Sequence, residues 1–452
     1  MNRAQVSVTG LIACCVARFG AAETPLVVHE WGTFTSFQDP RGATIAGINV
    51  DDEPVPAFVH RLGSMPVFAN TALPATWSQG APRCHSDVTL RLETPVLYFY
   101  PPVDWQAQPF DVEAAFSGGW LTEFYPSAQV DAGQFPNDLD ATTRGSVRWQ
   151  GLRLDPGAVA SMPQTTAGVW LAPRKVRAGI VMDPQTREAE KYLFYRGVGH
   201  LDAPLVVRER QDGWDVSLRA DSALANLPQV WLVEVLPGGR VRYQSAAAHG
   251  GTAHLKRFPL GAPNGLSTLR RELAAALTSR GLFADEADAM LETWKLSYFE
   301  SEGLRLFFLL PQAWTDSQLP LTISTPSVVT RVMVGRIELV TRRQRETLAR
   351  LRSLPLDAYP HLPLYYYDRR VLQASNQSGR SLSQLHELAG REVPESLRLY
   401  ESLGRFRDAL VMHEMNASAD DTTRTRLQRA IASYSACVPE TVLDPASLAN
   451  GK

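Results

Sequence analysis

Alternating apolar and polar positions, interrupted by turn residues, run through most of the first 260 residues of the chain. Residues 26–35 and 89–100 are rich in β-branched and aromatic side chains, which favour strands. Two hairpins are well marked, because glycine supplies the positive φ that their short turns at 211–213 and 237–239 require. Repeated short strands with regular turns between them are typical of a β-sandwich or a related open barrel.

The pattern then becomes helical for about thirty residues and returns to strands afterwards. Ser267 can cap a helix that ends near Gly281, and Asp285 can cap a second, shorter helix. The segment 296–310 has the apolar and aromatic content of a strand. We therefore expect a two-helix insertion at about 267–295 within the β-rich part of the chain.

Helical periodicity dominates the remainder of the chain. The segments with this periodicity are 341–353, 381–389, 395–415 and 421–434. Together these patterns predict an α+β fold. It consists of a large antiparallel β-sandwich-like body over residues 23–340 and a helical C-terminal region over residues 341–452.

The N-terminus has the three-part layout of a secretory signal peptide. Arg3 precedes a short apolar stretch, and small residues follow, which predicts a signal peptide over residues 1–22. Residues 11–14 also resemble a lipobox, in which case residues 1–13 are removed and Cys14 carries a lipid anchor. Either route predicts an exported protein, periplasmic or attached to the outer envelope, whereas a buried N-terminal strand is the alternative. The mature chain contains no apolar stretch of about 18 residues, so we expect no transmembrane segment in it.

The balance of charges limits the kinds of partner that the protein can bind. The 452 residues include 45 Lys and Arg against 47 Asp and Glu. This balance argues against nucleic-acid binding, which depends on neutralising many phosphates.

Cys84 and Cys437 remain after the leader. In an oxidising compartment they can form a disulfide, and otherwise they are two separate buried thiols.

Four separated blocks of sequence carry a resemblance to other proteins. They are HEWGTFT at 29–35, ETPVLYFY at 93–100, FESEGLR at 299–305 and RVMVGRIE at 331–338. These blocks resemble a family of uncharacterised exported bacterial proteins that open with an HEWGTFT-like string. The resemblance covers separated blocks within residues 26–340. It implies export and a shared fold, and it brings no assigned activity.

Paired acidic residues are the first candidates for chemistry. Glu300 and Glu302 lie two apart on an expected strand, so both project from one face. Two such carboxylates can bind a hard cation, or divide acid and base roles on a glycosidic bond. His29 and Glu30 point to opposite faces of another expected strand, and either can reach a cleft. These four residues are our catalytic candidates, and surface ion pairs and core packing are the alternative.

Arginine–glutamate pairs at strand spacing are a second group. Arg91 with Glu93, and Arg336 with Glu338, lie on the same faces of their expected strands. This spacing suits cross-strand salt links on a solvated sheet face. The functional alternative is that these residues line a charged binding groove. Glu93 is therefore a binding candidate.

Arg196 and His200 flank two glycines and can form an anion-binding turn, although no helix begins there.

The sequence lacks the signatures of serine esterases, nucleotide enzymes, zinc ribbons and haem attachment, so we assign no metal site and the cofactor stays unknown. We therefore expect an exported cell-envelope protein that is non-catalytic and binds a polymer or protein partner. The alternative is an envelope hydrolase that acts on a glycan or peptide polymer through its paired carboxylates.

Overall fold

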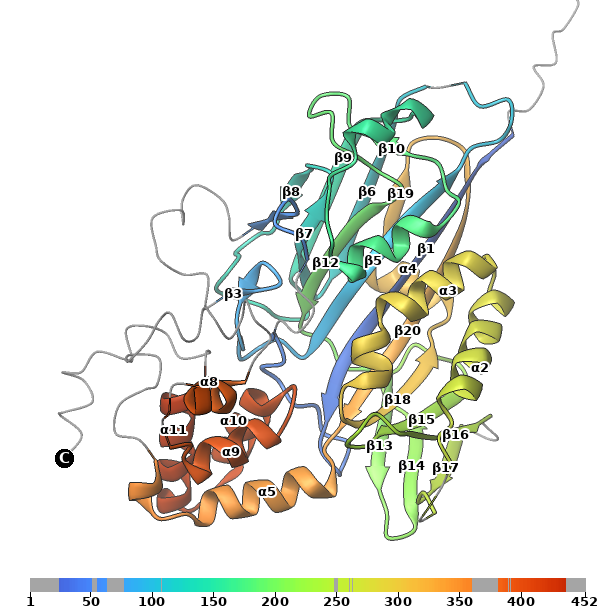
Figure 1. Ribbon diagram of the computed structural model, residues 1–452. Coiled ribbons are helices and arrows are strands. Elements are labelled where there is room, and N and C mark those ends of the chain that lie inside the picture. Colours follow the sequence, from blue (N-terminus) through green and yellow to red (C-terminus); the bar gives the residue numbers. More distant parts are fainter. Residues whose placement is uncertain are drawn as a thin grey trace, which may run out of the picture.

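The structure is a computed structural model, shown in Figure 1. It describes residues 24–50, 55–62, 77–106, 108–247, 251–259, 261, 263–359, 381–388, 390 and 392–435. The expected leader with Cys14, and also Cys437, lie outside the described residues, so the predictions made for them stay predictions. In the part of the chain that is described, every helix is too short or too polar to cross a membrane.

One large mixed sheet, with 15 strands among the described residues, dominates the molecule. Its main path runs, in spatial order, through β11 (Ala189–Glu190), β10 (Val181–Met182), β9 (Arg144–Leu154), β7 (Gly119–Tyr125), β12 (Leu193–Gly199), β5 (Leu90–Tyr100), β1 (Leu26–Gln38), β20 (Ser327–Leu339), β18 (Gly303–Leu309), β15 (Val230–Val235) and β16 (Val241–Ala246). Three further strands pair with this path: β6 (Phe110–Ser117), β2 (His60–Arg61) and β8 (Gln129–Asp131). A fourth, β19 (Leu321–Ile323), pairs with β6.

Two smaller sheets complete the β structure of the described residues. One contains β13 (Leu205–Glu209), β14 (Gly213–Leu218) and β17 (Thr252–Lys256), and the other contains β3 (Trp77–Ser78) and β4 (Ala81–Pro82). Both predicted hairpins are confirmed, because β13 pairs with β14 and β15 pairs with β16 in antiparallel register.

The strand β1 lies at the centre of the large sheet. It pairs in parallel with β20, from Leu26↔Ser327 to Gln38↔Leu339, and antiparallel with β5. Every residue of β1 except Val27 is buried, because both faces of the sheet are covered at this point. The α+β class is confirmed, but the predicted antiparallel β-sandwich is wrong. Period-two alternation identifies strands without identifying their partners, and β1 finds its parallel partner about three hundred residues away.

The helical insertion lies where the sequence predicts it. The helices α2 (Leu266–Ser279) and α3 (Ala284–Thr293) cover one face of the sheet, and Gly281 takes a φ of +107° between them. The next segment is a single π-helical turn, Leu296–Glu300, and β18 begins only at Gly303. The strand expected over 296–310 is therefore wrong in its first part. Periodicity alone does not distinguish a short buried helical turn from a buried strand.

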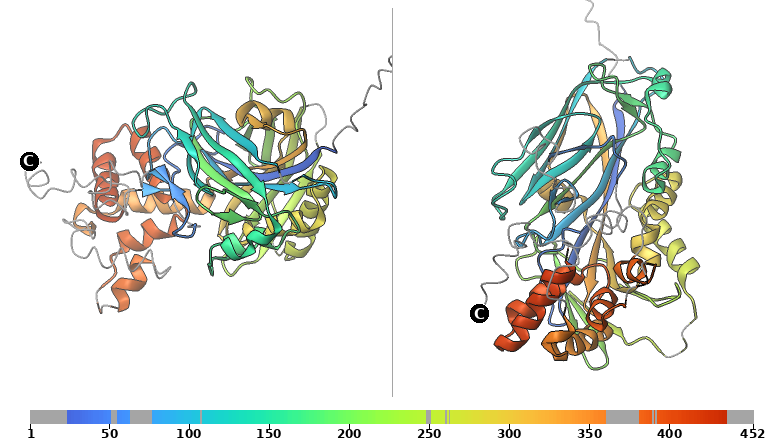
Figure 2. Two further views of the ribbon diagram at one scale, coloured as in Figure 1. Left: turned by 90° about the horizontal axis from the view of Figure 1, so that it is seen from above. Right: turned by 60° about the vertical axis from the view of Figure 1, so that its left-hand side comes forward.

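Several helices form the described part of the C-terminal region. They are α5 (Arg342–Ser353), α8 (Leu382–Leu388), α9 (Glu395–Ser402), α10 (Arg407–Ala417) and α11 (Asp421–Tyr434). The single helix expected at 395–415 is two helices, because the chain turns at Gly404, whose φ is +85°. Figures 1 and 2 show this region, in orange and red, packed at one end of the large sheet.

Two apolar clusters share the same face of the sheet. Trp31 and Tyr298 belong to the cluster beneath α2 and α3, whereas Phe37 and Phe406 belong to the cluster beneath the C-terminal helices. The opposite face carries a third cluster, which includes Phe34 and the residues of β6 and β9. Two separate helical layers thus cover one sheet face, and a boundary between them crosses β5, β1 and β20.

Short helical turns fill the remaining connections. They are η3 (Pro156–Ser161), α1 (Gly168–Leu171), η4 (Pro173–Lys175), α4 (Gln312–Gln318) and η6 (Leu356–Ala358).

Candidate functional site

The carboxylates of Glu300 and Glu302 are exposed and separately paired. Glu300 ends the π-helical turn, and its Oε1 lies 3.2 Å from Lys295 Nζ. Glu302 precedes β18, and its Oε2 lies 3.1 Å from Arg343 Nη1. About half of each glutamate side chain is exposed, at 48% and 52%. The expectation that they share one strand face is therefore wrong, because neither residue lies on a strand.

Glu30 is part of a buried ion pair on the face opposite α3. Its carboxylate accepts hydrogen bonds from the Tyr195 hydroxyl and from Arg331 Nε. Glu30 and Arg331 are direct register partners on the parallel strands β1 and β20. Burial first, and the negative charge of Glu30 second, hold the pKa of Tyr195 well above its ordinary value, so the phenol remains a neutral donor. This arrangement links β1, β20 and β12 at the centre of the sheet.

His29 attaches the start of α3 to the sheet. Its Nδ1 lies 2.8 Å from Oε2 of Glu286, which also accepts the backbone N–H of Phe283 at 2.6 Å. The Tyr100 hydroxyl donates to the other Glu286 oxygen at 2.8 Å. Glu286 is fully buried and occupies the first turn of α3, where its charge suits the helix N-terminus. The prediction that His29 and Glu30 point to opposite faces is confirmed.

Arg196 and His200 do not form a common turn. Arg196 lies on β12 and donates through Nε to Glu123 of β7, its direct register partner. His200 follows the strand, and its Nδ1 lies 2.7 Å from the backbone oxygen of Asp87. The predicted anion-binding turn is therefore wrong, because both glycines within it belong to β12, which pairs with a strand on each side.

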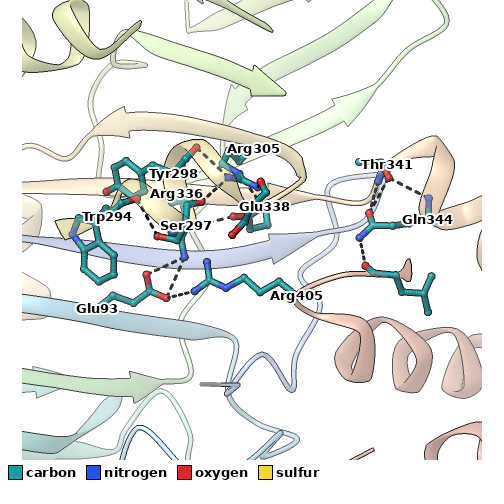
Figure 3. A network of polar contacts seen from close by, with 12 residues as sticks. Glu93, Trp294, Ser297, Tyr298, Arg305, Arg336, Glu338, Thr341, Gln344 and Arg405 are labelled. Carbon is teal, nitrogen blue, oxygen red and sulfur yellow. Dashed lines mark hydrogen bonds and ion pairs between the residues drawn. The ribbon is translucent and has the colours of Figure 1, made fainter. Parts of the chain in front are cut away.

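Glu93 is placed differently from the other candidates. Three arginine Nη2 atoms from three separate segments approach its carboxylate: Arg91 of β5 at 3.3 Å, Arg336 of β20 at 2.9 Å and Arg405 at 3.1 Å. Arg405 lies between α9 and α10, so this contact joins the C-terminal region to the sheet, as Figure 3 shows. Glu93 is 1% exposed.

A second carboxylate, Glu338, extends the same network along β20. Its Oε2 lies 3.3 Å from Arg305 Nε, and its Oε1 lies 3.5 Å from Arg336 Nε. Arg305 also donates to backbone oxygens of the π-helical turn, including that of Tyr298 at 3.1 Å. We call Arg91, Glu93, Arg305, Arg336, Glu338 and Arg405 the Arg–Glu cluster. Figure 3 labels all of these residues except Arg91.

Strand register explains why the cluster gathers at this place. Thr35 of β1 is the register partner of both Arg91 and Arg336, so these three side chains form a row on one sheet face. Glu93 and Glu338 each lie two residues further along, on the same face. This row lies at the boundary between the two helical layers. The expected cross-strand salt links are confirmed, but the expected solvated face is wrong, because the helices bury it.

A cavity of about 480 Å³ lies where the C-terminal helices meet the rest of the molecule. Its lining includes charged side chains from four separate segments. These side chains are Arg83, Glu302, Arg343, Glu401, Arg405, Arg407 and Asp408. A smaller hollow of about 120 Å³ adjoins it and shares Glu302, Arg343, Ser402 and Gly404. We call the larger space the junction cavity.

The acidic groups of the junction cavity have their own donors. The Tyr400 hydroxyl donates to Asp408, and burial together with this carboxylate raises the pKa of Tyr400 well above its ordinary value. Glu401 accepts the backbone N–H of Ser383 at 3.2 Å. With Glu302 paired to Arg343, each described acid on the wall is engaged.

Arg405 is the residue that sequence reasoning missed. It lines the junction cavity and also contacts Glu93, so it connects the cavity to the Arg–Glu cluster. The one available signal was Gly404, which interrupts a helical pattern immediately before it. Of the predicted site residues, Glu302 lines the cavity and Glu93 reaches it through Arg405.

Cys84 lies next to Arg83 on the cavity side of the molecule, and it is disulfide-bonded. The other three cysteines of the chain lie outside the described residues, so the predicted Cys84–Cys437 pairing stays a prediction.

Within the described ranges, no group of three or more His, Cys, Asp or Glu side chains is arranged to hold a metal ion. The models of known protein families include none that matches this chain. The curated proteins likewise include no significant match to it.

Proposed function

We propose that this chain is an exported, non-catalytic protein of the bacterial cell envelope that binds its ligand in the junction cavity. The observation that carries the proposal is the position of this cavity, between the sheet and the C-terminal helices, with charged residues on its wall. Ligand sites are concave, occur preferentially where structural units meet, and typically enclose about 300–1,000 Å³. The junction cavity has this position and this size.

The arrangement of carboxylates supports binding over hydrolysis. A glycosidase needs two carboxyl groups that face one bond from opposite sides. Glu300 instead faces solvent beside Lys295, and Glu302 lines the junction cavity beside Arg343. His29 and Glu30 are buried in separate structural contacts on opposite faces of the sheet. The cavity wall carries four guanidiniums, which position anionic groups and do not transfer protons at neutral pH. Its three carboxylates, Glu302, Glu401 and Asp408, are engaged by donors of the protein itself.

Two features support export. The N-terminal sequence pattern is that of a secretory signal or of a lipoprotein signal with an anchor at Cys14. Cys84 is disulfide-bonded, and structural disulfides persist in oxidising compartments such as the periplasm. We therefore place the protein in the periplasm or on the outer envelope.

A cavity-filling variant tests the binding role. Peptidoglycan sacculi, a neutral polysaccharide and an anionic polysaccharide serve as separate probes in a co-sedimentation assay. Ser402→Trp places a large ring at the cavity wall, whereas Ser279→Trp places the same ring on the exposed end of α2. We expect at least one polymer to bind to the natural protein and to Ser279→Trp, and to bind at least about tenfold more weakly to Ser402→Trp.

Two outcomes contradict the proposal. Equal binding by both tryptophan variants, or binding of no polymer by the natural protein, rejects the junction cavity as a polymer site. Release of soluble fragments from a polymer by the natural protein shows the hydrolase alternative instead.

A further inference from the structure

Exposed apolar side chains gather at the end of the large sheet where β1 begins and β5 ends. Six large apolar side chains are exposed in the described part of the chain, and three of them lie at this end. These three are Val103, which is fully exposed, and Phe283 and Val328, which are about half exposed. Single exposed apolar residues are ordinary on a protein surface, whereas a group of them marks contact with another molecule or a membrane.

The pairing of the strands places these side chains next to one another. Val27, near the start of β1, is the register partner of both Val328 and Tyr100, so the three side chains form a row across the sheet. Val27 lies two residues before His29, which contacts α3, and the row therefore lies on the face that α3 covers. On that face the ring of Phe283 lies 5.0 Å from the ring of Tyr100. Val27 and Tyr100 are themselves partly exposed, so the row and Phe283 form one apolar surface.

The turn after β5 extends this surface past the strand ends. Pro102 and Trp105 line a small hollow of about 40 Å³ together with Thr24 and residues 325–326. Val103 therefore lies close to the start of β1, with its side chain in solvent. We call Val27, Tyr100, Val103, Phe283 and Val328 the sheet-end patch.

The segments that form this end of the sheet contain few charges. Residues 101–106 and 324–330 include one charged side chain, that of Asp104. Beside Phe283, Asp285 lies 3.6 Å from Arg177, so charged side chains begin at the border of the patch. Charged side chains are the most costly ones to bring into the apolar layer of a membrane. Their scarcity at the sheet-end patch suits contact with lipid.

The position of the predicted leader identifies the occupant of this surface. Thr24 is the first described residue, and it lies beside the sheet-end patch. Cys14, where the lipobox-like sequence predicts a lipid anchor, precedes Thr24 by ten residues, and an extended chain of that length spans at most about 35 Å. A lipid on Cys14 therefore keeps this end of the sheet close to a bilayer.

The same placement orients the rest of the molecule. The strand β1 has 13 residues and so extends roughly 40 Å away from the sheet-end patch. At its other end, the ring of Phe37 lies 5.5 Å from the ring of Phe406 in the C-terminal region. Figures 1 and 2 show the C-terminal helices at the end of the sheet opposite to the start of β1. A bilayer at the sheet-end patch thus leaves the junction cavity on the side away from the membrane.

We infer that the sheet-end patch lies in the interfacial layer of a phospholipid bilayer, and that the junction cavity faces away from the membrane. The inference rests on the export in the proposed function and adds a lipid surface to the polymer ligand. The valine and phenylalanine side chains enter the apolar side of this layer, and the Tyr100 ring lies at the level of the headgroups, where tyrosine is enriched. Five side chains bury a small area, so the contact is weak on its own and is strengthened by an anchor.

Co-sedimentation of the mature chain, residues 23–452, with phosphatidylcholine vesicles tests the inference. These vesicles have no net charge, so binding reports apolar contact. We expect the natural chain to bind, and Val103→Asp combined with Val328→Asp to bind at least about tenfold more weakly. Leu388→Asp is the matched control, because Leu388 is also exposed but lies on α8 in the C-terminal region. Its vesicle binding should equal that of the natural chain.

A gain of binding guards against misfolding of the double variant. Val103→Trp places a side chain that favours the membrane interface at the most exposed position of the sheet-end patch. We expect it to bind the vesicles at least about threefold more tightly than the natural chain. Circular dichroism of all variants checks that their folds are the same.

The outcomes separate this inference from the proposed function. Absence of vesicle binding by the natural chain, equal binding by the double variant and Leu388→Asp, or no gain in Val103→Trp overturns the bilayer contact. Dimers of the natural chain that the double variant abolishes would show that a second copy covers the patch, and this also overturns it.

Polymer binding, measured on the same variants, makes the two failures distinguishable. The double variant should bind polymer as the natural chain does, and Ser402→Trp should bind vesicles as the natural chain does. Vesicle binding without polymer binding rejects the polymer site alone. Polymer binding without vesicle binding rejects the bilayer contact alone.

Discussion

The buried pair of Glu30 and Arg331 shows what single residues contribute to this fold. The two side chains lie side by side on parallel strands, and Tyr195 donates to the same carboxylate. Replacing such a pair by apolar residues often costs little, but removal of one partner leaves an uncompensated buried charge. The pair therefore makes the alignment of β1 and β20 specific, because a shift of one residue would separate the two charges.

We predict that Glu30→Gln lowers the free energy of unfolding by about 2–3 kcal/mol, because Arg331 then loses its buried carboxylate and keeps Asp316, whose side chain is half exposed, as its carboxylate partner. Urea unfolding followed by tryptophan fluorescence measures the effect. Glu300→Gln is the control, since Glu300 is half exposed and its removal should change stability by less than about 0.5 kcal/mol. Similar midpoints for the two variants would show that Asp316 alone compensates the charge of Arg331.

Residue-level prediction from the sequence succeeded where only local geometry was needed. Strand alternation places His29 and Glu30 on opposite faces, and this holds in the structure. Their partners were not predictable, because Glu286 and Arg331 are 257 and 301 residues away in the chain. Which carboxylate meets which cation depends on strand order, and no local pattern contains that information.

At the scale of elements, a network of ion pairs joins α5 to the three-stranded sheet of β13, β14 and β17. Glu209 of β13 binds Arg345 of α5 and also lies 2.7 Å from Arg257 Nη2. Burial by itself raises the pKa of Glu209, but the hydrogen bonds from both arginines outweigh it and lower the pKa below the ordinary value. Because the folded pKa is depressed, the stabilisation is present above the unfolded glutamate value of about 4.3 and is lost as pH falls through the folded value.

We predict that Glu209→Gln lowers Tm at pH 7 and that the difference from the natural protein shrinks as pH falls below about 4. Thermal unfolding between pH 3 and about pH 7, followed by circular dichroism, measures this difference. The control is Glu346→Gln, which removes an exposed carboxylate from α5, the helix of Arg345. Its Tm should differ little from that of the natural protein at any pH. A difference for Glu209→Gln that is constant down to the lowest pH would contradict the assignment.

The sequence predicted where most helices and hairpins occur along the chain better than it predicted how they are arranged in space. The hairpins, α2, α3 and most C-terminal helices lie where periodicity indicates. The predicted caps Ser267 and Asp285 are wrong, because each lies inside its helix, and Gly265 and Phe283 precede α2 and α3 instead. The errors fall at Leu296–Glu300 and Gly404, where a buried aromatic turn and a left-handed glycine interrupt longer patterns. Both positions border the junction cavity, since Ser301, Glu302 and Gly404 line it.

At the scale of the whole molecule, the candidate site depends on segments that only tertiary structure brings together. The Arg–Glu cluster takes residues from β5, β18, β20 and the α9–α10 connection. The sequence indicated two of its pairs, Arg91 with Glu93 and Arg336 with Glu338. It did not indicate that helices bury them, because the docking of the C-terminal region leaves no periodic signal in the strands beneath it.

We predict that protein exported into an oxidising compartment carries a disulfide between Cys84 and Cys437. Intact mass before and after reduction, followed by alkylation and peptide mapping, measures the pairing. Cys84→Ser and Cys437→Ser should each leave one alkylated thiol at the other position. Alkylation of Cys84 in the unreduced natural protein would contradict the prediction, and a different mapped partner would correct it.

The parallel pairing of β1 with β20 has a consequence for biosynthesis. At about 5–20 residues per second, a ribosome completes β20 about 15 to 60 seconds after β1. For that interval the strand that will occupy the middle of the sheet exposes an unpaired apolar edge. Fragments of the chain that end before β20 should therefore be prone to aggregation.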